Sequence, residues 1–144
     1  MMHNNKTILL VEDDAVDAMT VRRAFKDLQI NNPLHHAENG EQALTWLRDP
    51  AIKLPCLILL DMNMPRMNGT EFLREAKAEP CLRKIPVVVL TTSEEERDRA
   101  ESFNLGVAGY MLKPVDYNQF IDVVRIIDLY WTLSKLAPWS AHDK

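Results

Sequence analysis

Polar side chains that could react, donate a hydrogen bond or bind a metal ion stand at the ends of four apolar runs in this chain. They are Glu12, Asp13, Asp61, Thr91 and Lys113. Short apolar runs are typical of buried strands in a parallel sheet, which is apolar on both faces. Ligands of open α/β sheets gather beyond the carboxyl ends of the strands. We therefore expect these side chains to converge on one crevice.

The chemistry of this set favours phosphoryl transfer. Carboxylates that share one crevice repel one another by several kcal/mol in a low dielectric, so a bound divalent cation is expected. Ligands that are all oxygen, without His or Cys, point to Mg²⁺. Asp61 could then attack phosphorus as a nucleophile, while the metal and Lys113 stabilise charge on the equatorial oxygens. Thr91 could donate a hydrogen bond to a phosphoryl oxygen.

The elements that must position these residues alternate between strand and helix. Strands are predicted over residues 7–11, 34–37, 57–61, 87–90 and 107–112. Helices are predicted over residues 14–28, from 40 to near 50, and over 69–79, 93–105 and 116–136. Five strand and helix units in this order imply an α/β fold with a parallel sheet, right-handed crossovers and helices on both faces.

Local signals support these helices. The apolar positions at helical spacings in the first one are Val16, Met19, Ala24, Phe25 and Leu28. Ser93 and Glu96 have the spacing of a capping box ahead of the fourth helix. Asp116 and Gln119 are expected to cap the last helix.

The composition indicates one soluble domain. Residues 6–136 would form it, with a short tail over 137–144 of the 144-residue chain. The net charge of −4 argues against nucleic acid or an anionic membrane as the main partner, since both reward clustered Lys and Arg. No apolar run approaches the ~18 residues of a membrane span, and no secretory segment is found, so a cytoplasmic location is expected.

The motifs VEDD, DMNMPRMNG, LTTS and YMLKP follow the four apolar runs. With them, nearly the whole chain resembles the CheY-like receiver domain of two-component response regulators. The resemblance implies a doubly wound, flavodoxin-like (βα)5 fold with a five-stranded parallel sheet in the order 2-1-3-4-5. It also implies a stand-alone regulator that accepts a phosphoryl group on Asp61 from a histidine kinase or phosphotransfer protein. Such a protein catalyses only its own phosphorylation and slow dephosphorylation.

Further site residues are implied by the same resemblance. Mg²⁺ would be bound by Asp13, Asp61 and the backbone carbonyl of Asn63, with Glu12 acting in the acidic pocket through water. Asp14 falls outside this pattern and is expected to cap the first helix.

The resemblance also makes Thr91 and Tyr110 a switch pair, in which phosphorylation draws the hydroxyl inward and the ring turns into the vacated space. The surface near the fourth helix, the last strand and the last helix would change with it. The alternative for Tyr110 is a half-buried strand aromatic without a switching role.

The last predicted helix carries more apolar surface than packing on one sheet face requires. Candidate interface residues on it are Ile126, Ile127, Tyr130 and Trp131. Its length and aromatic pair resemble single-domain regulators that partner phytochrome-type histidine kinases and form homodimers. In the alternative, Trp131, Leu136 and Trp139 fold back over their own domain.

Other functions fit the sequence less well. A phosphohydrolase with a strand-end Asp nucleophile needs a second carboxylic acid two residues on, where this chain has Asn63. A flavodoxin would need a phosphate-binding loop where this chain has carboxylates. A receiver-like interaction module whose output is independent of phosphorylation remains the alternative. The histidines, among them His35 and His36, show no metal-binding spacing and are expected to be solvated or satisfied by hydrogen bonds.

Overall fold

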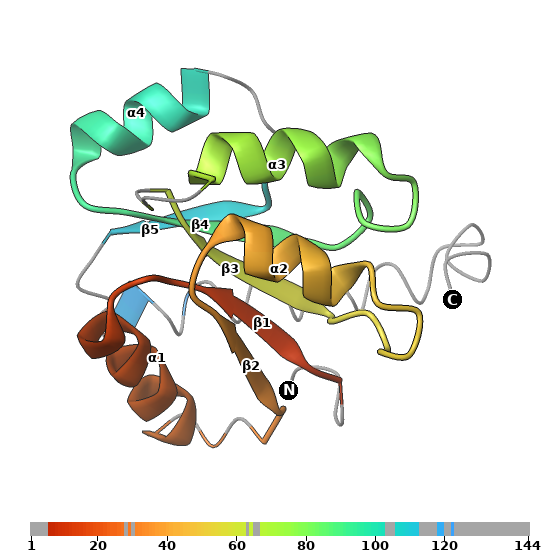
Figure 1. Ribbon diagram of the computed structural model, residues 1–144. Helices are drawn as coiled ribbons and strands as arrows, with labels where there is room; N and C mark the ends of the chain where they lie inside the picture. Colours follow the sequence, from red (N-terminus) through yellow and green to blue (C-terminus); the bar gives the residue numbers. More distant parts are fainter. Residues whose placement is uncertain are drawn as a thin grey trace, which may run out of the picture.

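The computed structural model describes residues 6–27, 29, 31–62, 64, 67–102, 106–112, 118, 119 and 122. Within these residues a five-stranded parallel sheet runs in the order β2-β1-β3-β4-β5 (Figure 1). The strands are β1 (Ile8–Val11), β2 (Leu34–Ala37), β3 (Leu57–Asp61), β4 (Val87–Thr91) and β5 (Gly109–Leu112). The helices are α1 (Ala15–Asp27), α2 (Gly40–Leu47), α3 (Gly69–Ala78) and α4 (Glu94–Ser102). The predicted fold class and strand order are confirmed.

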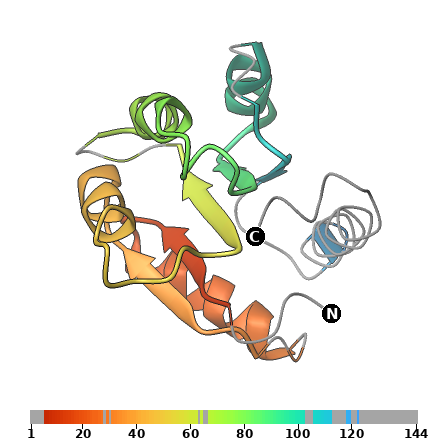
Figure 2. The same cartoon turned by 90° about the vertical axis from the view of Figure 1, so that its right-hand side faces the viewer.

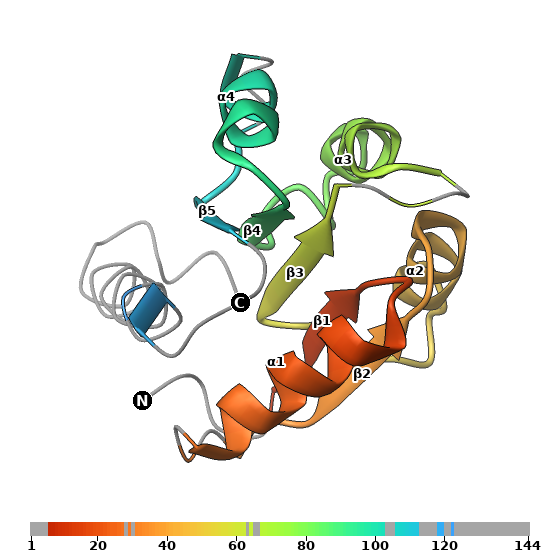
Figure 3. The ribbon, with the colours of Figure 1, turned by 90° about the vertical axis from the view of Figure 1, so that its left-hand side faces the viewer.

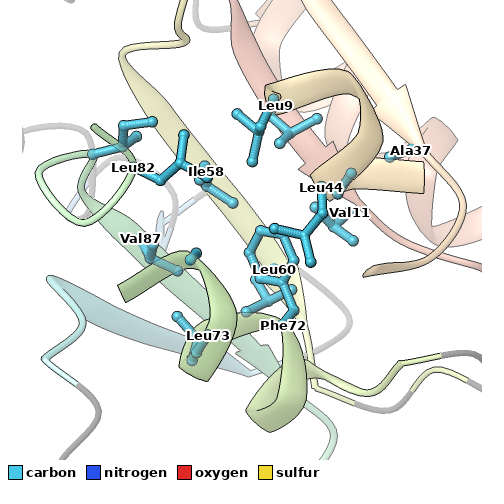
Figure 4. Close-up of a cluster of buried hydrophobic side chains, with 14 of the residues drawn as sticks. Leu9, Val11, Ala37, Leu44, Ile58, Leu60, Phe72, Leu73, Leu82 and Val87 are labelled. Atoms are coloured by element: carbon cyan, nitrogen blue, oxygen red, sulfur yellow. The ribbon is translucent and has the colours of Figure 1, made fainter. Parts of the chain in front are cut away.

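Two apolar clusters lie on opposite faces of the sheet. One packs side chains of β1, β3 and β4 against α2 and α3 (Figure 4). The other packs the alternate residues of the same strands against α1. Figures 2 and 3 show α1 on one side of the sheet and α2 and α3 on the other. Because these strands are buried on both faces, their sequences are continuous apolar runs.

The buried face of α1 is formed by three of its apolar residues. Ala18, Val21 and Phe25 are its buried residues, whereas Val16 is 70% exposed and Met19 is 59% exposed. Two sets of apolar residues at helical spacing share this helix. The set that packs on the sheet consists of Ala18, Val21 and Phe25. Val16 and Met19 therefore present an apolar surface to solvent.

Several element boundaries differ slightly from the predictions. β1 begins at Ile8 rather than at residue 7, and β4 ends at Thr91 rather than at residue 90. α2 ends at Leu47 rather than near residue 50, and the Arg48 N–H caps it by donating to the Leu44 carbonyl oxygen at 2.9 Å. β5 begins at Gly109 rather than at residue 107. Gly106 precedes it with φ of 68°, a left-handed conformation that glycine adopts without strain.

Helix caps hold the chain after β3 and β4. Asn68 and Glu71 form a capping box, in which each side chain accepts a hydrogen bond from the other residue's N–H at 3.0 Å. The predicted cap at Ser93 is confirmed, since its Oγ accepts from the Glu96 N–H at 3.1 Å. The Glu96 carboxylate accepts from the N–H of Thr92 at 3.0 Å. In a standard capping box it would accept from the N–H of the cap residue itself, Ser93.

Two helices begin in close contact with the segment that follows Asp61. A Cβ atom at Gly69 would lie 2.8 Å from Met62 Cα, and one at Gly40 would lie 2.8 Å from the Met67 carbonyl oxygen. These distances are too short for a side chain on either glycine. The starts of α2 and α3 therefore pack directly on the residues beyond β3.

Several predicted features lie outside the described residues. They are Leu28, Asn63, Lys113, Asp116, Ile126, Ile127, Tyr130, Trp131 and the tail over 137–144. Of the predicted last helix, residues 118, 119 and 122 are described, and they are helical. Among the residues described, no helix combines the length and apolar character of a membrane span.

Candidate functional site

Three carboxylates meet at the carboxyl ends of β1 and β3. One carboxylate oxygen from each of Glu12, Asp13 and Asp61 lies within 4.8 Å of the other two. Within the described residues, these three side chains have the spacing needed to hold a metal ion. Glu12 is fully buried and Asp61 is 1% exposed, while Asp13 is exposed. An all-oxygen set with one solvent-facing member fits Mg²⁺, which binds one or two carboxylates and keeps several waters.

Strand register brings these side chains together. β1 and β3 are parallel neighbours with Val11 opposite Leu60, so Glu12 lies opposite Asp61 just beyond the last residues of the ladder. On the other side of β3, Asp61 pairs with Leu90 of β4. The nucleophile candidate therefore sits at the centre of the sheet edge, as the sequence predicts.

The two acidic neighbours of Asp13 are bound to the chain in different ways. The Glu12 carboxylate accepts a hydrogen bond from the Asp14 N–H at 3.1 Å. Asp14 Oδ1 accepts from the N–H groups of Val16 at 2.8 Å and Asp17 at 3.0 Å. Asp14 therefore caps α1 and is not part of the carboxylate cluster, which confirms its predicted role.

Thr91 lies one strand further along the same edge. Its side chain is fully buried, and its hydroxyl donates to the Met111 carbonyl oxygen of β5 at 3.4 Å. Tyr110, opposite Val89 in the register, is partly buried and packs against the cluster beneath α2 and α3. Thr91 and Tyr110 are thus on neighbouring strands, two residues apart along the register, and their role as a switch pair stays a prediction.

The end of β5 is held by a side chain from beyond the strand. The Gln119 side-chain amide accepts from the Leu112 N–H at 2.9 Å and donates to the Leu112 carbonyl oxygen at 3.1 Å. Both backbone groups of Leu112 are thereby fixed, directly before Lys113 in the sequence. Lys113 and Asn63 themselves lie outside the described residues, so their predicted roles stay predictions.

Two histidines on β2 contact different neighbours. His35 stacks on Trp46 of α2, with ring centroids 4.2 Å apart and an interplanar angle of 9°. Burial lowers the pKa of His35 below its ordinary value, and the charge of His36 lowers it further. The His36 Nε2 lies 2.6 Å from the Glu12 carbonyl oxygen. The sequence predicts histidines that are solvated or satisfied by hydrogen bonds. It does not indicate that one of them contacts the acidic loop, which is formed by Glu12, Asp13 and Asp14.

Comparisons with known proteins agree with this geometry. The family model of the response regulator receiver domain matches residues 8–125. The response regulator Rcp1 of Synechocystis is 38% identical over 130 residues, which cover 88% of this chain and 88% of that protein. Its solved Mn²⁺-bound form has a TM-score of 0.70 and covers 88% of this chain and 94% of that one.

Two further solved structures are similar over most of this chain. The bacteriophytochrome response regulator AtBRR is 35% identical, with a TM-score of 0.80, and the match covers 88% of this chain and 94% of that chain. The phosphorylated cyanobacterial phytochrome response regulator RcpA is 35% identical, with a TM-score of 0.72, and the match covers 89% of this chain and 94% of that chain.

Proposed function

Because the chain belongs to the response regulator receiver domain family, we propose that it accepts a phosphoryl group on Asp61 from a histidine kinase or a phosphotransfer protein. The observation that supports this most directly is the buried Asp61 carboxylate within 4.8 Å of the Glu12 and Asp13 carboxylates. A divalent cation held there by Asp13 and Asp61 would offset the negative charge as phosphate approaches.

The transfer step follows from the position of Asp61. One Asp61 oxygen attacks phosphorus, the bond between phosphorus and the donor nitrogen breaks, and its electron pair returns to the donor imidazole. The product is an acyl phosphate on Asp61. By analogy with the family, Lys113 would pair with the phosphoryl oxygens and the Asn63 carbonyl would complete the metal site. We also propose that the acyl phosphate is lost by slow hydrolysis in the same site, without turnover of an external metabolite.

The test of this function is phosphoryl uptake by the full chain. With labelled acetyl phosphate as donor, label should appear on the protein in Mg²⁺ and be released by mild alkali, as an acyl phosphate is. In EDTA, uptake should stop because the carboxylate cluster then repels the donor's phosphate. Label that appears equally in EDTA would contradict the metal-dependent step. No label in Mg²⁺ would contradict the proposal as a whole and favour a module whose output does not depend on phosphorylation.

The exposed residues of α1 are a suitable contact for a protein donor. Val16 and Met19 are 70% and 59% exposed, and α1 starts directly after the loop that carries Asp13. Exposed apolar side chains on the helix that follows the acidic residues favour a partner that buries them while presenting a phosphorylated side chain. We propose that the kinase or phosphotransfer protein docks there.

Met19→Ala should slow phosphoryl transfer from a protein donor by about tenfold, the factor expected when a central apolar contact is lost. Transfer from acetyl phosphate should not change, because a small donor needs no docking surface. The matched control is Leu54→Ala, which removes an apolar side chain that is 38% exposed in the segment before β3. Equal slowing by both variants, or slowing with acetyl phosphate, would contradict the docking assignment.

We further propose that phosphorylation acts through Thr91 and Tyr110 and promotes association of two copies through the last predicted helix. The fully buried Thr91 hydroxyl, bonded to the Met111 carbonyl oxygen, must leave that partner to reach a phosphoryl group, which would disturb the end of β5. The residues proposed for the interface are Ile126, Ile127, Tyr130 and Trp131. A phytochrome-type kinase partner, output through proteins rather than nucleic acid, and a cytoplasmic location complete the proposal.

Sedimentation of the protein in Mg²⁺, with and without beryllofluoride, tests this coupling. The wild type should shift from monomer to dimer on addition of this phosphoryl mimic. Thr91→Val should bind beryllofluoride but remain a monomer, because the hydroxyl that senses the ligand is gone while the buried volume is kept. The control is Thr92→Val, which removes the hydroxyl of the exposed residue that follows Thr91. This variant should dimerise like the wild type. A dimer in both states, or dimerisation of Thr91→Val, would contradict the coupling.

A further inference from the structure

The Glu12 backbone is held by β2 beyond the end of the strand ladder. β1 and β2 pair from Ile8 opposite Leu34 to Val11 opposite Ala37. One residue further on, the Glu12 N–H donates to the Ala37 carbonyl oxygen at 3.0 Å. The Glu12 carbonyl oxygen is contacted at 2.6 Å by a side chain, the His36 imidazole. The edge strand therefore holds both polar groups of the Glu12 backbone.

The chemistry of this contact fixes the direction of the hydrogen bond. A carbonyl oxygen can only accept, so the His36 Nε2 must carry the proton and donate. The distance of 2.6 Å is short for a bond of this type. His36 and Glu12 are 24 positions apart in the chain. Because His36 is on the edge strand β2, the contact connects the edge of the sheet to the acidic loop.

The accepting carbonyl belongs to the peptide that joins Glu12 to Asp13. This peptide is planar, so holding its oxygen also fixes the direction in which the chain enters Asp13. Asp13 is the exposed member of the carboxylate cluster, and its orientation depends on the backbone that precedes it. Groups that orient metal ligands in this way contribute to metal affinity without touching the ion.

We propose that His36 is a positioning residue for the metal site, acting through its hydrogen bond to the Glu12 carbonyl to hold Asp13 in the orientation that binds the cation. This inference rests on the proposed function, because it assigns His36 a role in the same site. It predicts that loss of the Nε2 donor weakens metal binding before any phosphoryl donor is present.

His35 provides the matched control. It is the adjacent residue on β2, and its ring stacks on Trp46 of α2. Its strand partner Leu9 belongs to the cluster beneath α2 and α3, whereas Leu10, the partner of His36, belongs to the cluster beneath α1. The two imidazoles therefore lie on opposite faces of the sheet, so removing His35 should affect packing but not the acidic loop.

The experiment is titration of the unphosphorylated full chain with Mn²⁺, followed by the electron paramagnetic resonance signal of the free ion. His36→Leu should raise the Mn²⁺ dissociation constant by about threefold to tenfold, which corresponds to one net hydrogen bond. His36→Gln, whose amide can donate from a similar position, should restore the affinity to within about twofold of the wild type. His35→Leu should bind Mn²⁺ like the wild type. Urea unfolding of each variant in EDTA measures the loss of stability separately.

The outcomes separate this inference from the proposed function. If the wild type does not bind Mn²⁺, the metal site itself is refuted. If the wild type binds Mn²⁺ and His36→Leu binds it equally well, the positioning role alone is refuted. Equal weakening by His35→Leu, or no recovery in His36→Gln, would also refute it. If His36→Leu does not fold, His36→Asn, whose shorter amide does not reach the Glu12 carbonyl, replaces it and the same outcomes apply.

Discussion

Asp61→Asn is expected to abolish phosphoryl uptake while leaving the protein folded. The substitution keeps the size of the side chain but replaces the nucleophilic carboxylate with an amide, so no acyl phosphate can form. It also removes one of the three clustered carboxylates. Unit charges about 4 Å apart interact by about 4 kcal/mol at the effective dielectric of a protein surface, so the mutant loses a repulsion of this order before solvent screening. Its unfolding free energy in EDTA should therefore be no lower than that of the wild type.

Labelled phosphoryl uptake in Mg²⁺ and urea unfolding in EDTA together test this expectation. The matched control is Asp49→Asn, which changes the net charge equally at an exposed residue whose Oδ1 accepts from the Ala51 N–H, a bond that Asn can also accept. This control should take up label at the wild-type rate. Uptake by Asp61→Asn at that rate would contradict the assignment of the phosphoacceptor.

Asp13→Asn is expected to weaken Mg²⁺ binding by about tenfold or more, since even groups behind the metal ligands contribute factors of this size. Asp61 remains available as nucleophile, so phosphoryl uptake should persist but should require higher Mg²⁺ concentrations. The measurement is the Mg²⁺ concentration that gives half the maximal rate of uptake from acetyl phosphate. An unchanged half-maximal concentration would show that Asp13 is not a metal ligand.

The neighbouring residue supplies the control for this second variant. Asp14→Asn removes the same charge one position later, where the side chain caps α1 through the N–H groups of Val16 and Asp17. Asn is an equally good cap, so stability should be kept. If loss of negative charge near the pocket were sufficient to weaken metal binding, Asp14→Asn would have the same effect as Asp13→Asn. We instead expect the Mg²⁺ dependence of phosphoryl uptake by Asp14→Asn to be close to that of the wild type.

The strand-end residues could be predicted from the sequence because a buried parallel strand is a continuous apolar run that ends abruptly at the sheet edge. Asp61 after Leu57–Leu60 is such a case, and the register then brings it opposite Glu12. This regularity needs no information on side-chain packing. The convergence of Glu12, Asp13 and Asp61 therefore follows from topology alone once the order of strands and helices is known.

The face of α1 could not be predicted in the same way. Ala18, Val21 and Phe25 satisfy helical spacing, but so do Val16 and Met19 with the residues after them, and the spacing alone does not say which set packs on the sheet. The contact of His36 with the Glu12 carbonyl was also beyond the sequence. It depends on the parallel pairing of β1 with β2 and on a side-chain conformation that no local pattern encodes.

The central claim, that Asp61 forms an acyl phosphate in a metal-dependent step, is tested most directly by chemical trapping. Borohydride reduces a phosphorylated aspartate to homoserine, and peptide mass mapping then locates the altered residue. After incubation with acetyl phosphate in Mg²⁺, we predict homoserine at position 61 and, in EDTA, unaltered aspartate. Homoserine at another residue, such as Asp13 or Asp14, or conversion of Asp61 that is independent of Mg²⁺, would contradict the account.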